Sequence, residues 1–434
     1  MRLSDHARAT ALDLISFIDA SPSPWHAVAS AEQRLAAVGC TRLEEGARWS
    51  LKPGARHYVV RGGASLIAFV VGTRPLADAG FRIVGAHTDS PGLRLKPRPT
   101  SESEGLARLG VEVYGGPILA TFADRDLGLA GRVILRGAQG PQARLLRFAQ
   151  PLARLPNLAI HMNREVNEQG LKFDKQTELP LLLGQLGEGE KPEERLRALL
   201  ADAVQAAAAD LLSWELAAYD VQPGCLWGAN EEFIASRQLD NLASCHAALS
   251  ALAAVDAPPA TCVAALFDHE EVGSESAAGA GGSFVGDVLA RIGIAVGLDD
   301  EDRRRALSQS FFVSADMAHA WNPNFPAAYE PDHKLRVNGG PVIKSNANQR
   351  YATEATTAAR FMAACETAGV PFQQYSHRSN LGCGSTIGPI VAARLGIASV
   401  DVGSPMWAMH SARESAGAMD PAFMMAALAA VYAN

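Results

Sequence analysis

The chain has 434 residues, of which 48% are hydrophobic and 20% are charged, and this length is enough for a large core and two domains. Its net charge of −7 at pH 7 argues against a nucleic-acid partner. No run of about 18 apolar residues occurs, and the N-terminal stretch lacks the apolar segment of a signal peptide, so we expect no membrane partner. The six cysteines form no C-x-x-C pair, which favours reduced thiols and a cytoplasmic location.

Helical and strand periodicities follow one another in the first 95 residues. We expect helices over 4–20 and 25–38 and strands over 57–60, 65–71 and 81–86. The last of these strands ends in His87-Thr88-Asp89. Residues two apart in an extended segment point to one side, so Asp89 can fix the tautomer of His87.

The pattern changes between residues 96 and 231. Short strands such as 111–114 and 131–135 are separated by glycine-rich turns, and a helix is predicted over 193–212. We therefore expect a second, β-rich domain over 96–231, inserted into a first domain formed by 1–95 and 232–434.

The alternation of strands and helices returns after the insertion, which predicts an α/β fold for the first domain. A helix is expected to open near Asp240 and run to about residue 254. The further strands expected are 261–267, 310–315, 342–346, 372–375 and 397–402. The further helices expected are 353–368, one that ends near Gly396, and one within 414–432.

Two adjacent carboxylates, Glu270 and Glu271, lie at the exit of the apolar strand 261–267. In open α/β sheets, ligands bind at such strand exits. Neighbouring carboxylates repel each other when both are ionised, so the site needs a cation or a shared proton. One Glu could bind a divalent metal while the other remains free as a base. The alternative interpretation is a solvated acidic turn.

Candidate metal ligands stand at five separate places in the sequence, and at least three of them follow predicted strands. They are His87, Asp240, Glu271, Asp316 and His410. Two histidines and three carboxylates suit a pair of zinc-like ions with one bridging carboxylate. Each residue also has an ordinary structural interpretation: Asp240 and Asp316 could be helix caps, and a lone histidine at a strand end is often structural. The joint placement favours the metal site.

Other catalytic signatures are missing from the sequence. It contains no H-E-x-x-H motif, no G-x-S-x-G elbow and no Walker A loop. His269 and His319 are left over, and each could support a ligand, face the substrate or be a structural core residue.

With these residues in hand, the sequence resembles the aspartyl aminopeptidase family of co-catalytic zinc peptidases over nearly its whole length. The motifs that carry the resemblance are Ser21-Pro22-Ser23-Pro24-Trp25-His26, Ala86-His87-Thr88-Asp89-Ser90-Pro91, Arg237-Gln238-Leu239-Asp240-Asn241, Asp268-His269-Glu270-Glu271-Val272-Gly273-Ser274, Asp316-Met317-Ala318-His319-Ala320, Pro341-Val342-Ile343-Lys344-Ser345-Asn346 and Met409-His410-Ser411-Ala412-Arg413-Glu414. The resemblance implies a zinc-peptidase α/β/α catalytic domain with an inserted β-rich dimerisation domain.

The resemblance also implies roles for the site residues. Asp240 would bridge two metal ions, with His87 and Asp316 completing one site and Glu271 and His410 the other. Glu270 would be the general base, and Asp89 would orient His87. The ions would be zinc, although cobalt and manganese suit the same ligands.

A further histidine, His161, lies in the insertion, and in this family it is thought to act in the active site of a neighbouring subunit. It would polarise the scissile carbonyl or bind zinc. We favour the first role, because His161 is not at a strand exit of the main sheet. The family assembles as dimers that form a dodecamer.

The implied substrates are peptides with an acidic N-terminal residue, and binding their side chain requires a nearby cation. Lys344 is the candidate, with Tyr351 and His319 as weaker pocket residues. The alternatives are a broad-specificity aminopeptidase or an acyl-amino-acid deacylase on the same scaffold, and an inactive homologue that only binds a partner.

Overall fold

The computed structural model describes residues 3–434 and divides the chain into two compact units. Unit 1 consists of Met1–Asp89, Gly224–Met409 and Glu414–Asn434, and unit 2 consists of Ser90–Pro223 and His410–Arg413. The sequence analysis placed the insertion at 96–231. Unit 2 therefore consists of one long insertion together with four residues from near the C-terminus. No sequence pattern had indicated that these four residues belong to it.

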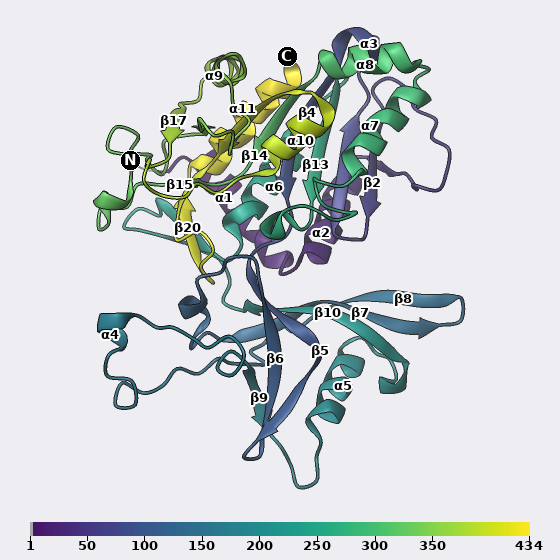
Figure 1. Ribbon diagram of the computed structural model, residues 1–434. Helices are drawn as coiled ribbons and strands as arrows, with labels where there is room; N and C mark the ends of the chain where they lie inside the picture. Colours follow the sequence, from purple (N-terminus) through teal and green to yellow (C-terminus); the bar gives the residue numbers. More distant parts are fainter. Residues whose placement is uncertain (1–2) are drawn as a thin grey trace. The chain divides into compact units, whose positions relative to one another are not determined.

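Unit 1 is built on a mixed nine-stranded sheet, whose four central strands β13, β4, β14 and β18 are parallel (Figure 1). In spatial order the strands are β1 (Thr41–Arg42), β2 (Arg56–Arg61), β3 (Ser65–Val70), β13 (Thr261–Phe267), β4 (Phe81–His87), β14 (Phe311–Ala315), β18 (Ala398–Gly403), β16 (Val342–Ser345) and β17 (Gln373–Ser376). Parallel strands need crossover connections, and the helices of this unit supply them.

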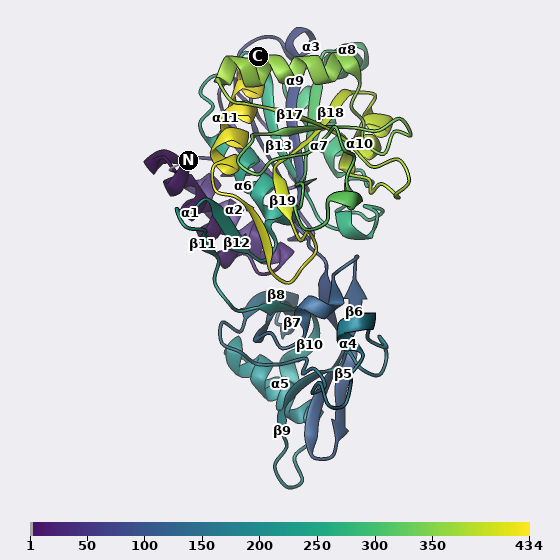
Figure 2. The ribbon, with the colours of Figure 1, turned by 90° about the vertical axis from the view of Figure 1, so that its left-hand side faces the viewer.

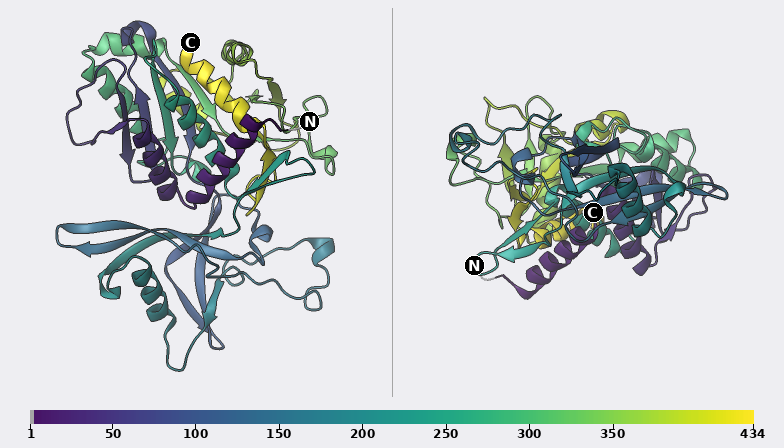
Figure 3. Two further views of the ribbon diagram at one scale, coloured as in Figure 1. Left: turned by 180° about the vertical axis from the view of Figure 1, so that it is seen from behind. Right: turned by 90° about the horizontal axis from the view of Figure 1, so that it is seen from below.

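Helices cover both faces of this sheet (Figures 1 and 3). One face carries α1 (Asp5–Ala20), α2 (Pro24–Ala37), α6 (Leu239–Ala253), α9 (Ala355–Ala368) and α11 (Asp420–Ala433). The other carries α3 (Leu76–Ala79), α7 (Phe284–Ala295), α8 (Asp300–Ser308) and α10 (Ile387–Leu395). The expected α/β/α architecture of this unit is therefore confirmed.

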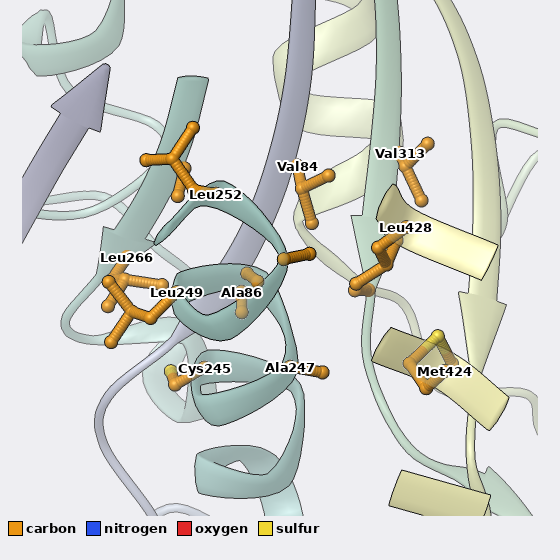
Figure 4. Packing of buried hydrophobic residues seen from close by; sticks show 14 of the residues in the cluster. Val84, Ala86, Cys245, Ala247, Leu249, Leu252, Leu266, Val313, Met424 and Leu428 are labelled. Atoms are coloured by element: carbon orange, nitrogen blue, oxygen red, sulfur yellow. The ribbon is translucent and has the colours of Figure 1, made fainter. Parts of the chain in front are cut away.

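The sheet is apolar on both faces because its central strands are nearly continuous hydrophobic runs. In β13, Cys262, Ala264 and Leu266 pack on one face, and the residues between them pack on the other. Figure 4 shows Leu266 of β13 and Val84 of β4 beside α6 and α11. Burying one such large side chain stabilises the fold by about 1.5–3 kcal/mol, and a polar residue on either face would lose this contribution.

A smaller five-stranded sheet in unit 1 carries the segments that flank the candidate site. Its strands, in spatial order, are β11 (Cys225–Trp227), β12 (Phe233–Ser236), β20 (Glu414–Gly417), β19 (Pro405–Trp407) and β15 (Ala318–His319). Ser236 of β12 pairs with Glu414 of β20, so the approach to α6 lies beside the chain that follows His410 in sequence.

Unit 2 contains a six-stranded antiparallel sheet with helix α5 (Pro192–Ala203) packed against it (Figure 2). The strands, in spatial order, are β8 (Gly140–Arg147), β7 (Leu127–Gly137), β10 (Leu211–Asp220), β5 (Gly92–Ser103), β6 (Leu106–Tyr114) and β9 (Leu181–Gln185). Short helical turns are η1 (Leu119–Phe122), α4 (Val166–Gln169) and η2 (Ala208–Asp210), with η3 (Glu270–Val272) and η4 (Pro326–Ala328) in unit 1.

The prediction of a helix over 193–212 is wrong for the second half of that range. Helix α5 ends at Ala203, and β10 begins at Leu211. The alanine run over 206–209 resembles a helix, but β10 pairs along β7 and buries Leu211 and Leu216 in the core of unit 2. Tertiary pairing therefore outweighs local helix propensity here.

None of the helices in the described part of the chain is long and apolar enough to cross a membrane. All six cysteines are free thiols.

Candidate metal centre

Three adjacent parallel strands of unit 1 end in potential metal ligands. His87 is the last residue of β4, Asp316 follows β14, and Glu270 and Glu271 follow β13 after two residues. Phe267 of β13 pairs with His87 of β4, so the strand ends are level. The carboxyl ends of parallel strands share one edge of a sheet, which brings these side chains together.

Asp240 joins them from the start of α6. Its backbone is extended (φ −83°, ψ 107°), as is usual at the start of a helix. Asp240 Oδ1 lies 3.4 Å from His87 Nε2. The side chain of Asn241 donates to the carbonyl of Ala315 over 2.9 Å, which ties the start of α6 to the end of β14.

The ligand atoms form two overlapping groups whose members lie within 4.8 Å of one another. One group is His87, Glu270 and Asp316, and the other is His87, Asp240 and Glu271. His87 Nε2 lies 3.5 Å from Asp316 Oδ1 and 3.9 Å from Glu270 Oε2. An imidazole and several carboxylates within this space match the donors that zinc binds, so the residues fit a zinc-type centre. The geometry alone leaves Glu270 as a possible ligand as well as a possible base.

Asp89 supports both sides of this cluster. Its carbonyl oxygen lies 3.1 Å from His87 Nδ1, closer than its own carboxylate, which is 3.5 Å away. The carboxylate instead accepts the backbone N–H groups of Glu270 and Glu271, each over 3.1 Å. A bond from Nδ1–H to the carbonyl leaves the Nε2 lone pair facing the cluster.

The charges of the cluster are unbalanced when no cation is counted. Burial by itself favours the neutral imidazole, but Glu270, together with the other nearby carboxylates, raises the pKa of His87 well above its usual range. Burial, with the neighbouring carboxylates, also raises the pKa of Glu270. Repulsion between buried carboxylates underlies both shifts, and a divalent cation would relieve it.

Two residues to which the sequence analysis gave no role hold the ligands in place. The Glu414 carboxylate accepts the backbone N–H of Asp240 over 3.1 Å, and Glu414 is 2% exposed. The Cys245 thiol lies 3.0 Å from the carbonyl oxygen of His87 and donates to it. Glu414 stands four residues after His410 in a quoted motif, so its position in the sequence was a usable signal.

Lys344 is a buried cation beside the cluster. It is 2% exposed, and its Nζ lies 3.8 Å from Asp316 Oδ2 and 3.1 Å from the carbonyl oxygen of Met317, to which it donates. The ammonium also lies 5.0 Å from the ring centroid of Tyr351, a cation–π distance. These contacts hold the positive charge at one side of the acidic cluster.

Three aromatic side chains of unit 1, His319, Tyr375 and His377, lie close to one another. His319 lies 6.3 Å from Tyr375 and 6.2 Å from His377 between ring centroids, and the Tyr375 hydroxyl lies 2.6 Å from His377 Nδ1. Burial, then the Lys344 charge and His377, lowers the pKa of His319 to about 4, so its imidazole is neutral at pH 7. Tyr375 and His377 were not singled out from the sequence, because the loop after β17 carries no recognisable motif.

The remaining predicted site residues lie elsewhere. His269 Nδ1 lies 2.8 Å from the Ser276 hydroxyl, which gives this leftover histidine a local structural role. His410 belongs to unit 2, where its Nδ1 lies 3.1 Å from the carbonyl oxygen of Gly116. His161, also in unit 2, is exposed. Neither His410 nor His161 is among the grouped ligand atoms.

An α/β sheet with histidine and carboxylate ligands gathered at its parallel strand ends defines a metallohydrolase-type centre. The sequence model of the family described as "Aminopeptidase I zinc metalloprotease (M18)" matches residues 17–432. The chain belongs to this M18 family of zinc aminopeptidases, and the predicted enzyme class is confirmed.

Relatives and solved structures agree with this assignment. The chain is 48% identical over 427 residues to a probable M18 family aminopeptidase 2 from Stutzerimonas stutzeri, covering 97% of each chain. It is 46% identical to the protein of the same name from Pseudomonas fluorescens, again over 97% of each chain. The fold matches the cryo-EM structure of the Ape4 and Nbr1 complex with a TM-score of 0.96, 36% identity, and coverage of 100% of this chain and 88% of that one. It also matches the S. cerevisiae mApe1 dodecamer with a TM-score of 0.86 and 25% identity, over 98% and 96% of the two chains.

Proposed function

We propose that this aminopeptidase removes N-terminal Asp and Glu residues from peptides, using two divalent metal ions, most simply zinc. The observation that carries the substrate proposal is Lys344, a cation buried beside the acidic cluster. An ammonium held at the edge of a catalytic centre is suited to pairing with a substrate carboxylate.

For the metal centre we propose Asp240 as the bridging ligand, with His87 and Asp316 on one ion and Glu271 and His410 on the other. The close approach of Asp240 and Asp316 to His87 Nε2 supports the first set. Glu270 lies 3.9 Å from His87 Nε2, farther than Asp240 and Asp316, and we assign it as the base. Bound ions would supply Lewis acidity that polarises the scissile carbonyl and lowers the pKa of the attacking water.

Glu270 carries the protons of the reaction. Its carboxylate accepts a proton from water as the water oxygen attacks the carbonyl carbon, and it returns that proton to the amine nitrogen as the C–N bond breaks. Asp89 fixes the backbone of Glu270 and the ring of His87 through its three contacts, so base and ligand keep their relative positions. This preorganisation lowers the reorganisation needed in the transition state.

We assign His161 to the neighbouring subunit's reaction, where it would donate a hydrogen bond to the developing oxyanion. Its exposure and the exposed apolar residues beside it, Leu158 and Met162 at 63% and 76%, support a role in a contact between subunits. The dodecameric state of the similar mApe1 structure supports dimers of this chain that assemble into a dodecamer.

We assign the acidic side chain of the substrate to Lys344, with Tyr351 and His319 lining its pocket. Tyr351 is 4% exposed, and the Lys344 ammonium lies over its ring. A neutral His319 adds a hydrogen-bonding wall without a second charge. A leucine side chain in such a pocket would give the ammonium no substrate carboxylate to pair with, so the transition state would be bound less tightly.

The test compares hydrolysis of Asp-, Glu- and Leu-p-nitroanilide by the purified enzyme, after chelation, and after adding back zinc, cobalt or manganese, with metal content measured in each state. We expect metal-dependent cleavage that favours the acidic substrates. Metal-dependent cleavage without that preference would keep the metal centre and reject the pocket. Cleavage of N-acetyl-amino acids in place of p-nitroanilides would support a deacylase.

A further inference from the structure

Unit 2 contains a cavity of about 330 Å³ whose lining includes three cationic side chains, Lys96, Arg98 and Arg108, and no acidic one. The hydroxyls of Thr100, Ser101 and Thr177 and the amide of Gln176 complete its polar lining, beside Pro99, Gly110, Val111 and Pro180. In a chain of net charge −7, a concave site lined by three cations and no carboxylate is suited to an anionic ligand.

The cavity is formed by a break in the sheet. Strands β5 and β6 pair regularly up to Leu95 opposite Val111 and resume at Thr100 opposite Leu109, so the residues between Leu95 and Thr100 bulge out. Two of these residues are prolines, which have no N–H to donate to the ladder. The bulge therefore places Lys96 and Arg98 outside the ladder, and both line the cavity.

Gly110 lets this bulge sit close to β6. A Cβ at Gly110 would lie 3.3 Å from the carbonyl oxygen of Pro99 and 3.6 Å from Cδ of Lys96. Arg108 is two residues earlier on the same strand and thus on the same face as Gly110. The lysine stem and the Arg108 side chain are accordingly held over one small area of the sheet.

The cationic head groups have few partners within the protein. Arg108 Nε is buried and has no hydrogen-bond partner among residues 3–434. Lys96 Nζ donates to the neutral Gln176 side chain over 3.2 Å. A buried guanidinium nitrogen without a partner is costly, and an anion in the cavity would satisfy it.

We propose that this cavity binds a phosphate group, either inorganic phosphate or the phosphate of a small metabolite. Three cations from two strands, together with the hydroxyl residues of the lining, suit a tetrahedral dianion better than a planar carboxylate, which one arginine can bind in a bidentate way. The charge of the ligand would balance the lining cations.

Bound phosphate would also fasten the loop that carries His161. Residues 156–180 contain one short helix, α4, and include the Gln176–Thr177 turn that lines the cavity. Asp174 Oδ1 shapes this turn by accepting the backbone N–H groups of Gln176 and Thr177. A ligand that bonds this turn and Arg108 at once would join the end of the loop to the sheet.

The test uses the metal-loaded full-length enzyme and its Arg108→Gln and Lys96→Gln variants. The matched control is Arg144→Gln, which removes an equal charge from β8 at the far side of the sheet order. Isothermal titration with inorganic phosphate, at ionic strength fixed with chloride, gives the number and affinity of sites. Phosphate that binds the metal centre is unaffected by these substitutions, so the difference between variants reports the cavity.

We expect one phosphate site per chain that is weakened about tenfold or more in Arg108→Gln and Lys96→Gln and unchanged in the control. Phosphate should also slow tryptic cleavage after Lys172 and Lys175 in the loop, in the wild type and not in Arg108→Gln. A parallel titration with AMP distinguishes the sources: AMP binding at this site assigns a phosphorylated metabolite, and its exclusion assigns inorganic phosphate. Equal phosphate binding and equal loop cleavage in all four proteins would overturn the proposal.

Discussion

The two units differ in how far their charged side chains are buried. In unit 1, His87, Asp89, Asp240 and Lys344 are all at most 3% exposed, and they meet at the ends of buried strands. Among the described residues of unit 2, only Asp220 is a charged residue with so little exposure, and His161 is exposed. Buried charge is tolerated only when it is paired, so the cluster of unit 1 points to a cation without reference to any partner.

An exposed residue carries no such information. His161 is exposed in a loop of unit 2, so its surroundings within one chain give no indication of its chemistry. A metal centre can therefore be inferred from a single chain, whereas the oxyanion role proposed for His161 can be tested only in the assembly. The predictions below test that division, beginning with the largest effect.

Glu270→Gln should lower kcat by about 10²- to 10⁴-fold, because the amide cannot accept the proton of the attacking water. The metal content, measured by mass spectrometry of the native protein, should stay at the wild-type level, since Glu270 is proposed as a base and not a ligand. Glu275→Gln, five residues further along the chain at an exposed position, is the control and should keep full activity. Loss of one metal ion in Glu270→Gln would make this residue a ligand.

His161→Ala should lower kcat by about 10²- to 10³-fold, the usual effect of losing one oxyanion donor. If the residue acts on a neighbouring subunit, mixing His161→Ala with Asp240→Ala chains should restore part of the activity, because some sites then combine an intact metal centre with an intact histidine. The mixing is verified with two affinity tags. Verified mixed oligomers without any recovery would return His161 to its own subunit and break the division between the units.

The same contrast explains which site residues could be placed from the sequence. His87, Glu270, Glu271 and Asp316 could be placed at one sheet edge because each follows a strong apolar strand. The role of Asp240 was harder to predict, since an aspartate at the start of a helix usually caps it. The two cases are distinguished by the position of its carboxylate, 3.4 Å from His87 Nε2, which only the structure shows.

The elements and bounds of unit 2 were harder to predict from the sequence, for physical reasons. The end of α5 was misjudged because the alanines over 206–209 have high helix propensity, and long-range pairing with β7 decides the outcome. His410–Arg413 belong to unit 2 because of contacts between residues far apart in the sequence. One of these is the hydrogen bond that the backbone N–H of Ala412 donates to the Thr121 hydroxyl. Periodicity reports which face of an element is buried and carries no information on such pairings.

Lys344→Met should lower kcat/KM for Asp- and Glu-p-nitroanilide by about 10- to 100-fold and change Leu-p-nitroanilide much less, because one charge-assisted hydrogen bond is lost. Lys52→Met, at an exposed position of unit 1, is the control. Since Lys344 also lies 3.8 Å from Asp316, metal content is measured alongside. An equal loss on all three substrates would show that the buried cation supports the metal centre and does not select the substrate.

The smallest effect concerns Asp420, another buried charge of unit 1, which is 1% exposed at the start of α11. Burial raises its pKa to about 7, although its carboxylate accepts the backbone N–H groups of Asn338 and Gly340. A raised folded-state pKa contributes stability that is complete below the unfolded value of about 3.9 and is lost as the pH rises through 7. Between pH 5 and pH 8, the unfolding midpoint of the wild type should therefore fall by about 2–5 °C relative to Asp420→Asn.

This comparison uses the change with pH and not the absolute midpoint, because asparagine also alters the two hydrogen bonds at every pH. Asp256→Asn, at an exposed position of the same unit, provides the baseline and should follow the wild type across the range. If Asp420→Asn also follows the wild type, the two backbone donors stabilise the ionised carboxylate enough to cancel the cost of burying it. Hydrogen bonds from the chain would then satisfy a buried charge in unit 1 without any cation, and burial alone would no longer distinguish the metal centre from an ordinary carboxylate cap.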